Sequence, residues 1–104
     1  MREGSFFGYN TKSVQGAINL YFAAVLNKVD NNSHENVSVL LDVKKEGTTI
    51  FHKKVLLKPG FSSTERYLNI PVSVDGTYKI SFTINGTKNS KTNVVFLKVG
   101  IFND

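Results

Sequence analysis

The fold is decided by residues 75–84, which read DGTYKISFTI. Within this stretch apolar and polar side chains alternate, and one face is apolar throughout. That face carries Tyr78, Ile80, Phe82 and Ile84. A period of two is typical of a strand in an antiparallel sheet with one buried face. Asp-Gly before the strand and Asn-Gly after it are turn signals at both ends. The other apolar segments must therefore cover this face.

Further strand patterns lie on both sides of this stretch. They are residues 17–27, 37–44, 48–57, 64–72 and 93–101. Short strands at regular spacing, separated by turn residues, are typical of a sandwich or barrel. The sequence therefore predicts an all-β fold, a sandwich or barrel of about six or seven strands with an N-terminal arm.

Three details of these strands can be predicted from local patterns. Pro71 cannot donate to a ladder, so its strand is expected at an edge. The apolar pattern of residues 48–57 changes phase around His52, which predicts a bulge or a passage between the sheets. In the last strand we expect one apolar face toward the core. That face would carry Val95, Leu97, Val99 and Ile101.

The 104 residues are enough for one domain, which we divide into an arm, residues 1–16, and a sandwich, residues 17–104. Phe6, Phe7 and Tyr9 of the arm stand among glycine and polar residues, and such aromatic side chains need a groove to enter. The arm is then an extra strand on its own sandwich or a donor strand that docks on a neighbouring copy. A disordered remnant is the third alternative.

The cysteine count, the net charge and the lengths of the apolar runs limit the classes of protein to which this chain can belong. The chain has no cysteine, so no disulfide supports the fold. Its net charge of +5 keeps the domain soluble, and no apolar run has the length of a membrane span. The first residues lack the apolar segment of a signal peptide, although a trimmed chain would still be compatible with export.

The motif Gly76-Thr77-Tyr78 resembles the tyrosine corner of immunoglobulin-like domains, in which a tyrosine hydroxyl bonds to the backbone upstream. Residues 37–84 also resemble bacterial adhesion-type and CARDB-like immunoglobulin folds. They share a glycine turn at Gly47, the turn Lys58-Pro59-Gly60 and the Gly-x-Tyr motif. The resemblance implies that the fold is an immunoglobulin-like antiparallel β-sandwich. It also implies a binding or spacer module at the cell surface or outside the cell, and not an enzyme.

Catalytic and metal motifs are missing from the sequence. The two histidines have no acidic partner at ligand spacing, and the carboxylates are scattered. We therefore predict no enzymatic activity and no cofactor. The polar segment around Asp30, Asn32 and Glu35 offers oxygen ligands for calcium, but turn propensity explains the same residues.

Lys44, Lys45, Lys53 and Lys54 lie on the two arms of a predicted hairpin and form a candidate basic patch for phosphate or an acidic polymer. The alternative is that they only solubilise an exposed sheet and deter strand pairing. The aromatic side chains are placed mostly inward, which argues against nucleic-acid binding.

Two classes of function remain. The first, which we place ahead, is a structural subunit of a fibre at the cell or spore surface. Copies of the chain would join by strand addition, with the arm as donor. The second is a monomeric immunoglobulin-like module that binds a carbohydrate or a protein through its loops. A virion decoration or tail protein is a variant of either class.

Overall fold

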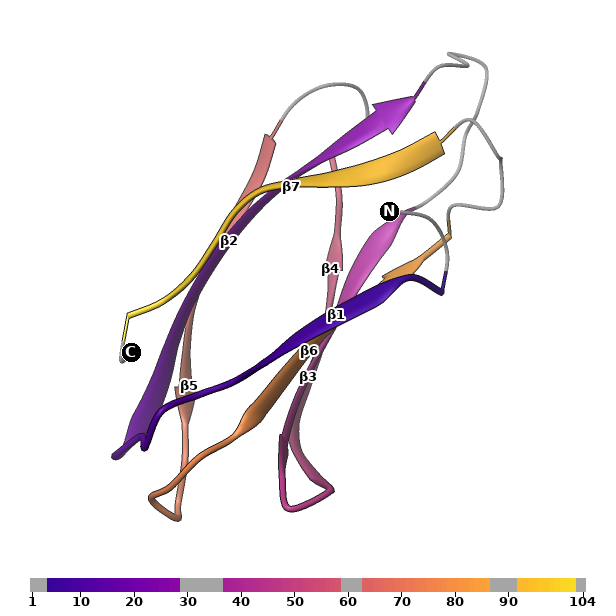
Figure 1. Ribbon diagram of the computed structural model, residues 1–104. Coiled ribbons are helices and arrows are strands. Elements are labelled where there is room, and N and C mark those ends of the chain that lie inside the picture. The colour runs from indigo at the N-terminus through magenta and orange to yellow at the C-terminus, as the bar shows by residue number, and fades with distance from the viewer. Residues whose placement is uncertain (1–3, 29–36, 59–62, 87–91, 103–104) are drawn as a thin grey trace.

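A computed structural model describes residues 4–28, 37–58, 63–86 and 92–102 of the chain (Figure 1). Every regular element in these ranges is a strand, which confirms the all-β class. The strands are β1 (Phe6–Asn10), β2 (Ala17–Lys28), β3 (Ser38–Lys45), β4 (Thr48–Leu56), β5 (Ser63–Pro71), β6 (Lys79–Asn85) and β7 (Thr92–Ile101).

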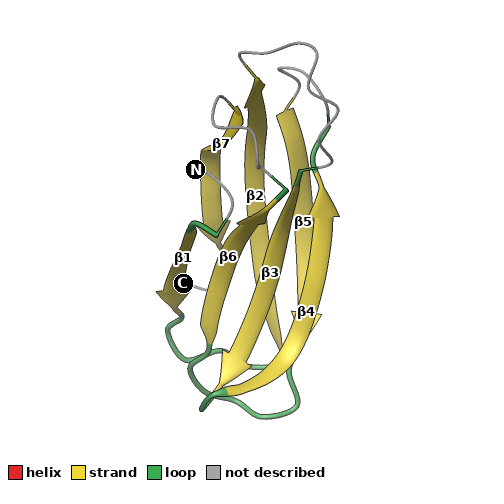
Figure 2. Ribbon diagram, turned by 90° about the vertical axis from the view of Figure 1, so that its right-hand side faces the viewer, coloured by secondary structure: helices red, strands yellow, loops and turns green. Residues whose placement is uncertain are grey.

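The strands form two antiparallel sheets that pack face to face (Figure 2). The order is β1-β6-β3-β4 in the four-stranded sheet and β5-β2-β7 in the three-stranded sheet. Strand β5 lies at an edge, as Pro71 predicted. The fold is therefore the predicted immunoglobulin-like β-sandwich. The described residues include no helix with the length and apolar character that crossing a membrane requires.

The core lies between the sheets, and β6 is at its centre. Ile80, Phe82 and Ile84 are at most 1% exposed, so the predicted alternation is confirmed. Strand β2 covers them from the other sheet. Its fully buried side chains are Ile18, Leu20, Phe22, Ala24 and Leu26. Full burial of one large apolar side chain contributes about 1.5–3 kcal/mol, so these two strands supply much of the stabilisation.

Tyr78 is buried just before β6 and anchors several backbone segments there. Its hydroxyl donates a hydrogen bond to the carbonyl of Val74, the contact that the tyrosine-corner resemblance implied. Its backbone N–H donates to the hydroxyl of Thr11 at 3.0 Å. Gly76 exchanges two backbone hydrogen bonds with Val14, at 2.8 and 3.1 Å. The corner therefore ties the segment that follows β1 to the start of β6.

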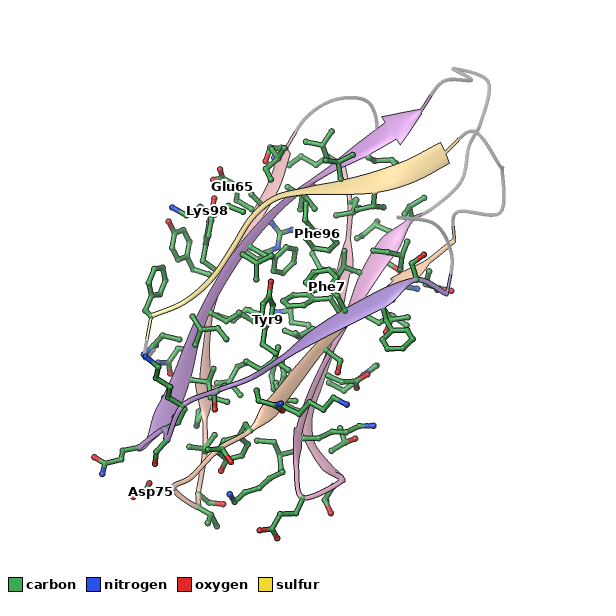
Figure 3. The ribbon with its side chains drawn as sticks, in the orientation of Figure 1. Phe7, Tyr9, Glu65, Asp75, Phe96 and Lys98 are labelled. Carbon is green, nitrogen blue, oxygen red and sulfur yellow. The ribbon has the colours of Figure 1, made fainter. Side chains whose placement is uncertain are left out.

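Strand β1 pairs with β6 of the same chain, with Phe7 opposite Phe82. The Phe7 ring lies 5.0 Å from the Phe82 ring and 4.8 Å from the Phe96 ring, between their centroids, in the space between the sheets (Figure 3). A Cβ atom on Gly8 would lie 2.9 Å from the carbonyl oxygen of Ile80, so this close pairing requires glycine. The arm fills a groove in its own sandwich, which leaves the donor-strand hypothesis without support.

The other two aromatic side chains of the arm are not core residues. Phe6 is 75% exposed. Tyr9 is 41% exposed and touches the edge of the Phe7 ring, with centroids 5.8 Å apart. Alternation in β1 places Phe6 on the opposite face from Phe7, whereas Tyr9 shares the face of Phe7 and packs against its ring.

Strand β7 corrects one prediction. Val95 and Leu97, expected to face the core, are 42% and 60% exposed. The pairing register with β2 shifts here, because Phe96 and Lys98 pair with consecutive residues of β2 and Leu97 is skipped. One extra residue reverses which side chains face inward. Phe96 therefore packs on the core, and from Val99 onward the predicted phase holds.

The β3–β4 hairpin turns at Glu46 and Gly47, which have φ angles of 51° and 82°. Two consecutive positive φ angles are the requirement of a type I′ turn, the common connection of a two-residue hairpin. The predicted irregularity in β4 is also present, because the pairing with β3 skips Ile50. It lies at Ile50 and not at His52, and both strands stay in one sheet.

The two phenylalanines of β1 offer a direct test of how the arm docks. We expect Phe7→Ala to lower the free energy of unfolding by about 1–3 kcal/mol, because it removes a partly buried ring from the core. Phe6→Ala removes the same atoms from a position that is 75% exposed, and it should change the stability little. Urea unfolding of both variants measures the difference. Equal stabilities would contradict the docking of β1 on its own chain.

The tyrosine corner gives a second test. Tyr78→Phe keeps the ring but removes the hydrogen bond to Val74. We expect a loss of about 1 kcal/mol in unfolding free energy, the usual net value of one hydrogen bond. Tyr67→Phe is the matched control, because that side chain is 72% exposed. Thermal unfolding compares the two variants, and a wild-type melting temperature for Tyr78→Phe would refute the role of the hydroxyl.

Candidate functional site

The four lysines predicted as a basic patch do not gather in the structure. Lys53 and Lys54 pair with residues in the first half of β3, whereas Lys44 and Lys45 are its last two residues. The partner of Lys44 in the other direction is Lys79 of β6. The candidate patch thus divides in two, and a lysine from a distant strand joins one half.

The calcium candidates Asp30, Asn32 and Glu35 lie outside the described residues. Within the described part of the chain, no three His, Asp or Glu side chains are grouped so that they could hold a metal ion. Asp42 and His52 form a cross-strand pair on β3 and β4, with Oδ1 and Nδ1 2.7 Å apart. Each side chain is the partner of the other, and no ligand is needed to explain them.

Three aromatic side chains meet on the outer face of the three-stranded sheet. Tyr21 of β2 pairs with Tyr67 of β5, so both rings project from adjacent strands on the same side. Phe102 follows β7, and its backbone N–H donates to the carbonyl of Asn19 at 2.9 Å, which holds the ring beside the other two. We call Tyr21, Tyr67 and Phe102 the aromatic face.

The rings of the aromatic face form one cluster. Tyr67 and Phe102 are nearly parallel, with 12° between their planes and 6.2 Å between centroids. The Tyr21 ring is tilted by 40° to the Tyr67 ring, with 4.5 Å between centroids. Tyr67 is 72% and Phe102 64% exposed, but Tyr21 is only 9% exposed. Gly100 is the β7 partner of Tyr21, and a Cβ atom added there would meet no atom within 4 Å. Tyr21 is therefore the buried base of the aromatic face, and the other two rings face the solvent.

Polar groups border the rings. The amide Nδ2 of Asn69 donates to Oδ1 of Asn19 across β5 and β2 at 2.7 Å. Both residues line a shallow pocket of about 190 Å³ together with Tyr67 and Phe102. The exposed Asn69 therefore presents polar amide atoms directly beside an apolar surface.

Charged side chains stand at the other end of the aromatic face. Glu65 and Lys98 both pair with Ala23 of β2, from β5 and β7, and they lie on the outer side of the sheet (Figure 3). The Lys98 ammonium is 5.8 Å from the centroid of the Tyr21 ring. Burial raises the pKa of Tyr21 above 10.0, and the neighbouring Glu65 carboxylate, which accepts its hydrogen bond, raises the pKa further.

This arrangement suits a flat ligand that carries both apolar and polar groups. Large exposed rings are uncommon on a soluble surface unless they are used, and a stack with adjacent amides can bind one face and the edge of such a ligand. The described residues here offer ring, amide and charged contacts for a ligand.

The aromatic face is absent from the sequence-based predictions, although the sequence contains a signal for it. Asn19 and Tyr21 are separated by one residue, as are Tyr67 and Asn69. In both strands these residues alternate with side chains that pack in or against the core. An aromatic residue on the outward side of a strand is therefore the pattern to look for. That the two copies of the pattern face each other depends on the strand register.

Comparison with known proteins adds a likeness in fold. No family model matches the chain, and no curated protein matches it. Among solved structures, the chain is similar to the CBM36-1 domain of a multidomain xylanase from the hindgut metagenome of Trinervitermes trinervoides. The TM-score is 0.51 at 20% identity, over 94% of this chain and 72% of that chain. At this identity the likeness concerns the fold alone, and it agrees with the sandwich described above.

The raised pKa of Tyr21 predicts how stability changes at high pH. A pKa that is higher in the folded than in the unfolded protein stabilises the fold below the unfolded value, near 10.0, and this contribution is lost as the pH rises through the folded value. We expect tyrosinate absorbance to show one late-titrating tyrosine that is absent in Tyr21→Phe. Glu65→Gln should move this titration to lower pH, and an unchanged titration would contradict the assigned cause.

Proposed function

We propose that this protein is a non-catalytic carbohydrate-binding module that uses the aromatic face to bind a polysaccharide. The single observation that carries the proposal is the exposed stack of Tyr67 and Phe102 on the buried ring of Tyr21, beside a pocket with two amides. Of the functions considered from the sequence, this one belongs to the class of monomeric binding modules. Its site lies on a sheet and not on the loops.

The chemistry of a sugar chain fits this surface. A pyranose ring has an apolar face of C–H bonds, which packs on an aromatic ring and removes apolar area from water. Its hydroxyl groups lie at the ring edge, where amide groups such as that of Asn69 can donate and accept hydrogen bonds. Rings that are already stacked lose little conformational freedom when the ligand binds, which favours affinity.

The fold comparison supports the same class of function. The CBM36-1 domain, a carbohydrate-binding module by its name, is a sandwich of similar architecture. Fold alone does not define a ligand, and so the proposal depends on the aromatic face. A polysaccharide ligand of this kind implies work outside the cell or at its surface, which is the location that the sequence resemblance also implied.

We do not retain the fibre subunit as the leading function. That hypothesis required an arm that does not pack on its own sandwich. In the structure, Phe7 already packs on Phe82 and Phe96 of the same chain. Strand addition would therefore have to displace a formed strand. The particle size of the full-length protein in solution separates the two functions, because a binding module of this kind needs no second copy.

Binding to a panel of insoluble and soluble polysaccharides, including xylan and cellulose, tests the proposal. We expect Tyr67→Ala and Phe102→Ala each to weaken binding roughly tenfold, the value of about one aromatic stacking contact. Phe6→Ala is the matched control, because it removes an equally exposed ring from the other sheet. Affinity electrophoresis and calorimetry measure the effect.

Two outcomes would contradict the proposal. The first is that the intact protein binds no polysaccharide of the panel. The second is that Phe6→Ala weakens binding as much as Tyr67→Ala does, since the aromatic face would then have no special role. Circular dichroism of each variant shows that a loss of binding is not a loss of fold.

A further inference from the structure

A second pocket lies on the four-stranded sheet, away from the aromatic face. It has a volume of about 460 Å³ and is formed where β1, β3 and β6 meet the β3–β4 turn. Lys44, Lys45 and Lys79 line it together with Asn10. We call these four residues the lysine pocket. It includes one half of the basic patch that the sequence predicted.

Lys45 is held in place by its surroundings. Its ammonium lies 4.9 Å from the centroid of the Tyr78 ring and 3.5 Å from the carbonyl oxygen of Thr77. A Cβ atom on Gly76 would lie 2.6 Å from the same ammonium, so the glycine makes room for it. A charge that is positioned by a ring, a carbonyl and a glycine is preorganised for a ligand.

Lys44 and Lys79 are direct cross-strand partners on β3 and β6, and the next residue in the same row is Asn10 of β1. Like charges directly opposite each other are destabilising. Neither lysine has an ion-pair partner among the described residues. This row therefore places two lysines and one asparagine side by side on three adjacent strands.

The pocket also contains a carboxylate, that of Glu46 in the turn. One negative charge against three ammonium groups leaves a net positive site. Among the described residues of the lining, the only aromatic ring is that of Tyr78, which is 3% exposed and covered by Lys45. Because no ring is free to stack on a base, the lining does not suit nucleic acid.

We propose that the lysine pocket binds the carboxylate or sulfate group of an acidic polysaccharide. This inference rests on the proposed function, since it names the charge class of the sugar chain. The ammonium groups supply charge-assisted hydrogen bonds to an oxyanion, and the amide of Asn10 supplies a neutral one. The aromatic face on the opposite sheet would bind uncharged parts of the polymer.

The experiment compares two ligands with the same sugar backbone, the charged polygalacturonate and its uncharged, fully methyl-esterified form. We expect the acid form to bind at least roughly tenfold tighter at low salt, with the difference shrinking as salt is added. The double variant Lys44→Ala/Lys79→Ala should abolish this difference. Lys53→Ala/Lys54→Ala removes the same charge outside the pocket and should keep it.

Glu46→Gln provides an independent variant, because it adds no cavity and removes the one negative charge of the lining. It should tighten the acid form by roughly two- to fivefold and leave the ester unchanged. This measurement keeps the proposal testable even where the double lysine variant loses its fold.

The outcomes separate the two proposals. Equal binding of acid and ester, with both lost in Tyr67→Ala, overturns the lysine pocket and leaves the carbohydrate-binding function intact. An equal effect of the two double lysine variants also overturns it, because the attraction would then be unspecific. Binding of inorganic sulfate alone, seen as amide shifts at Lys44 and Lys79 without any polysaccharide binding, overturns both the polysaccharide assignment and the proposed function.

Discussion

The contact on which the structure depends is the packing of Phe82 in the middle of the sandwich. Its ring centroid lies 5.0 Å from Phe7, 5.5 Å from Phe22 and 5.8 Å from Phe96. These rings come from β1, β2 and β7, so one side chain of β6 contacts both sheets and both terminal strands. Stacked and edge-to-face pairs of this kind add to the stabilisation that burial alone provides. The inner faces of the two sheets pack on each other, and their outer faces remain accessible for function.

Strand alternation links this core to both candidate sites. Tyr21 is the neighbour of the buried Phe22, and Tyr67 projects from the strand that pairs with β2. Lys79 in turn is the neighbour of the buried Ile80. Each outward side chain is therefore oriented by an inward one, and the sites are on strands whose backbone is fixed by pairing. Sites built on regular elements are held more precisely than sites on loops.

The sequence predicts most of the fold because the period of two is strong in β2, β3 and β6. The predicted orientation of Leu97 is wrong because a bulge cannot be recognised within a run of apolar residues, each of which could face inward. The candidate sites are harder to predict for another reason. Tyr21 meets Tyr67, and Lys44 meets Lys79, only through cross-strand register, which local patterns do not specify. The arm was ambiguous because its pattern is the same for a groove in its own chain or in another copy.

The contact between Phe7 and Phe96 also affects how the chain folds. Phe7 of the first strand packs on Phe96 of the last, so the packing of β1 is complete only when β7 is also present. Contacts between residues so far apart in sequence form slowly, because the intervening chain must be ordered first. During translation the groove beside β6 and β2 is therefore exposed until β7 leaves the ribosome, and this is the period in which a chaperone would be of most use.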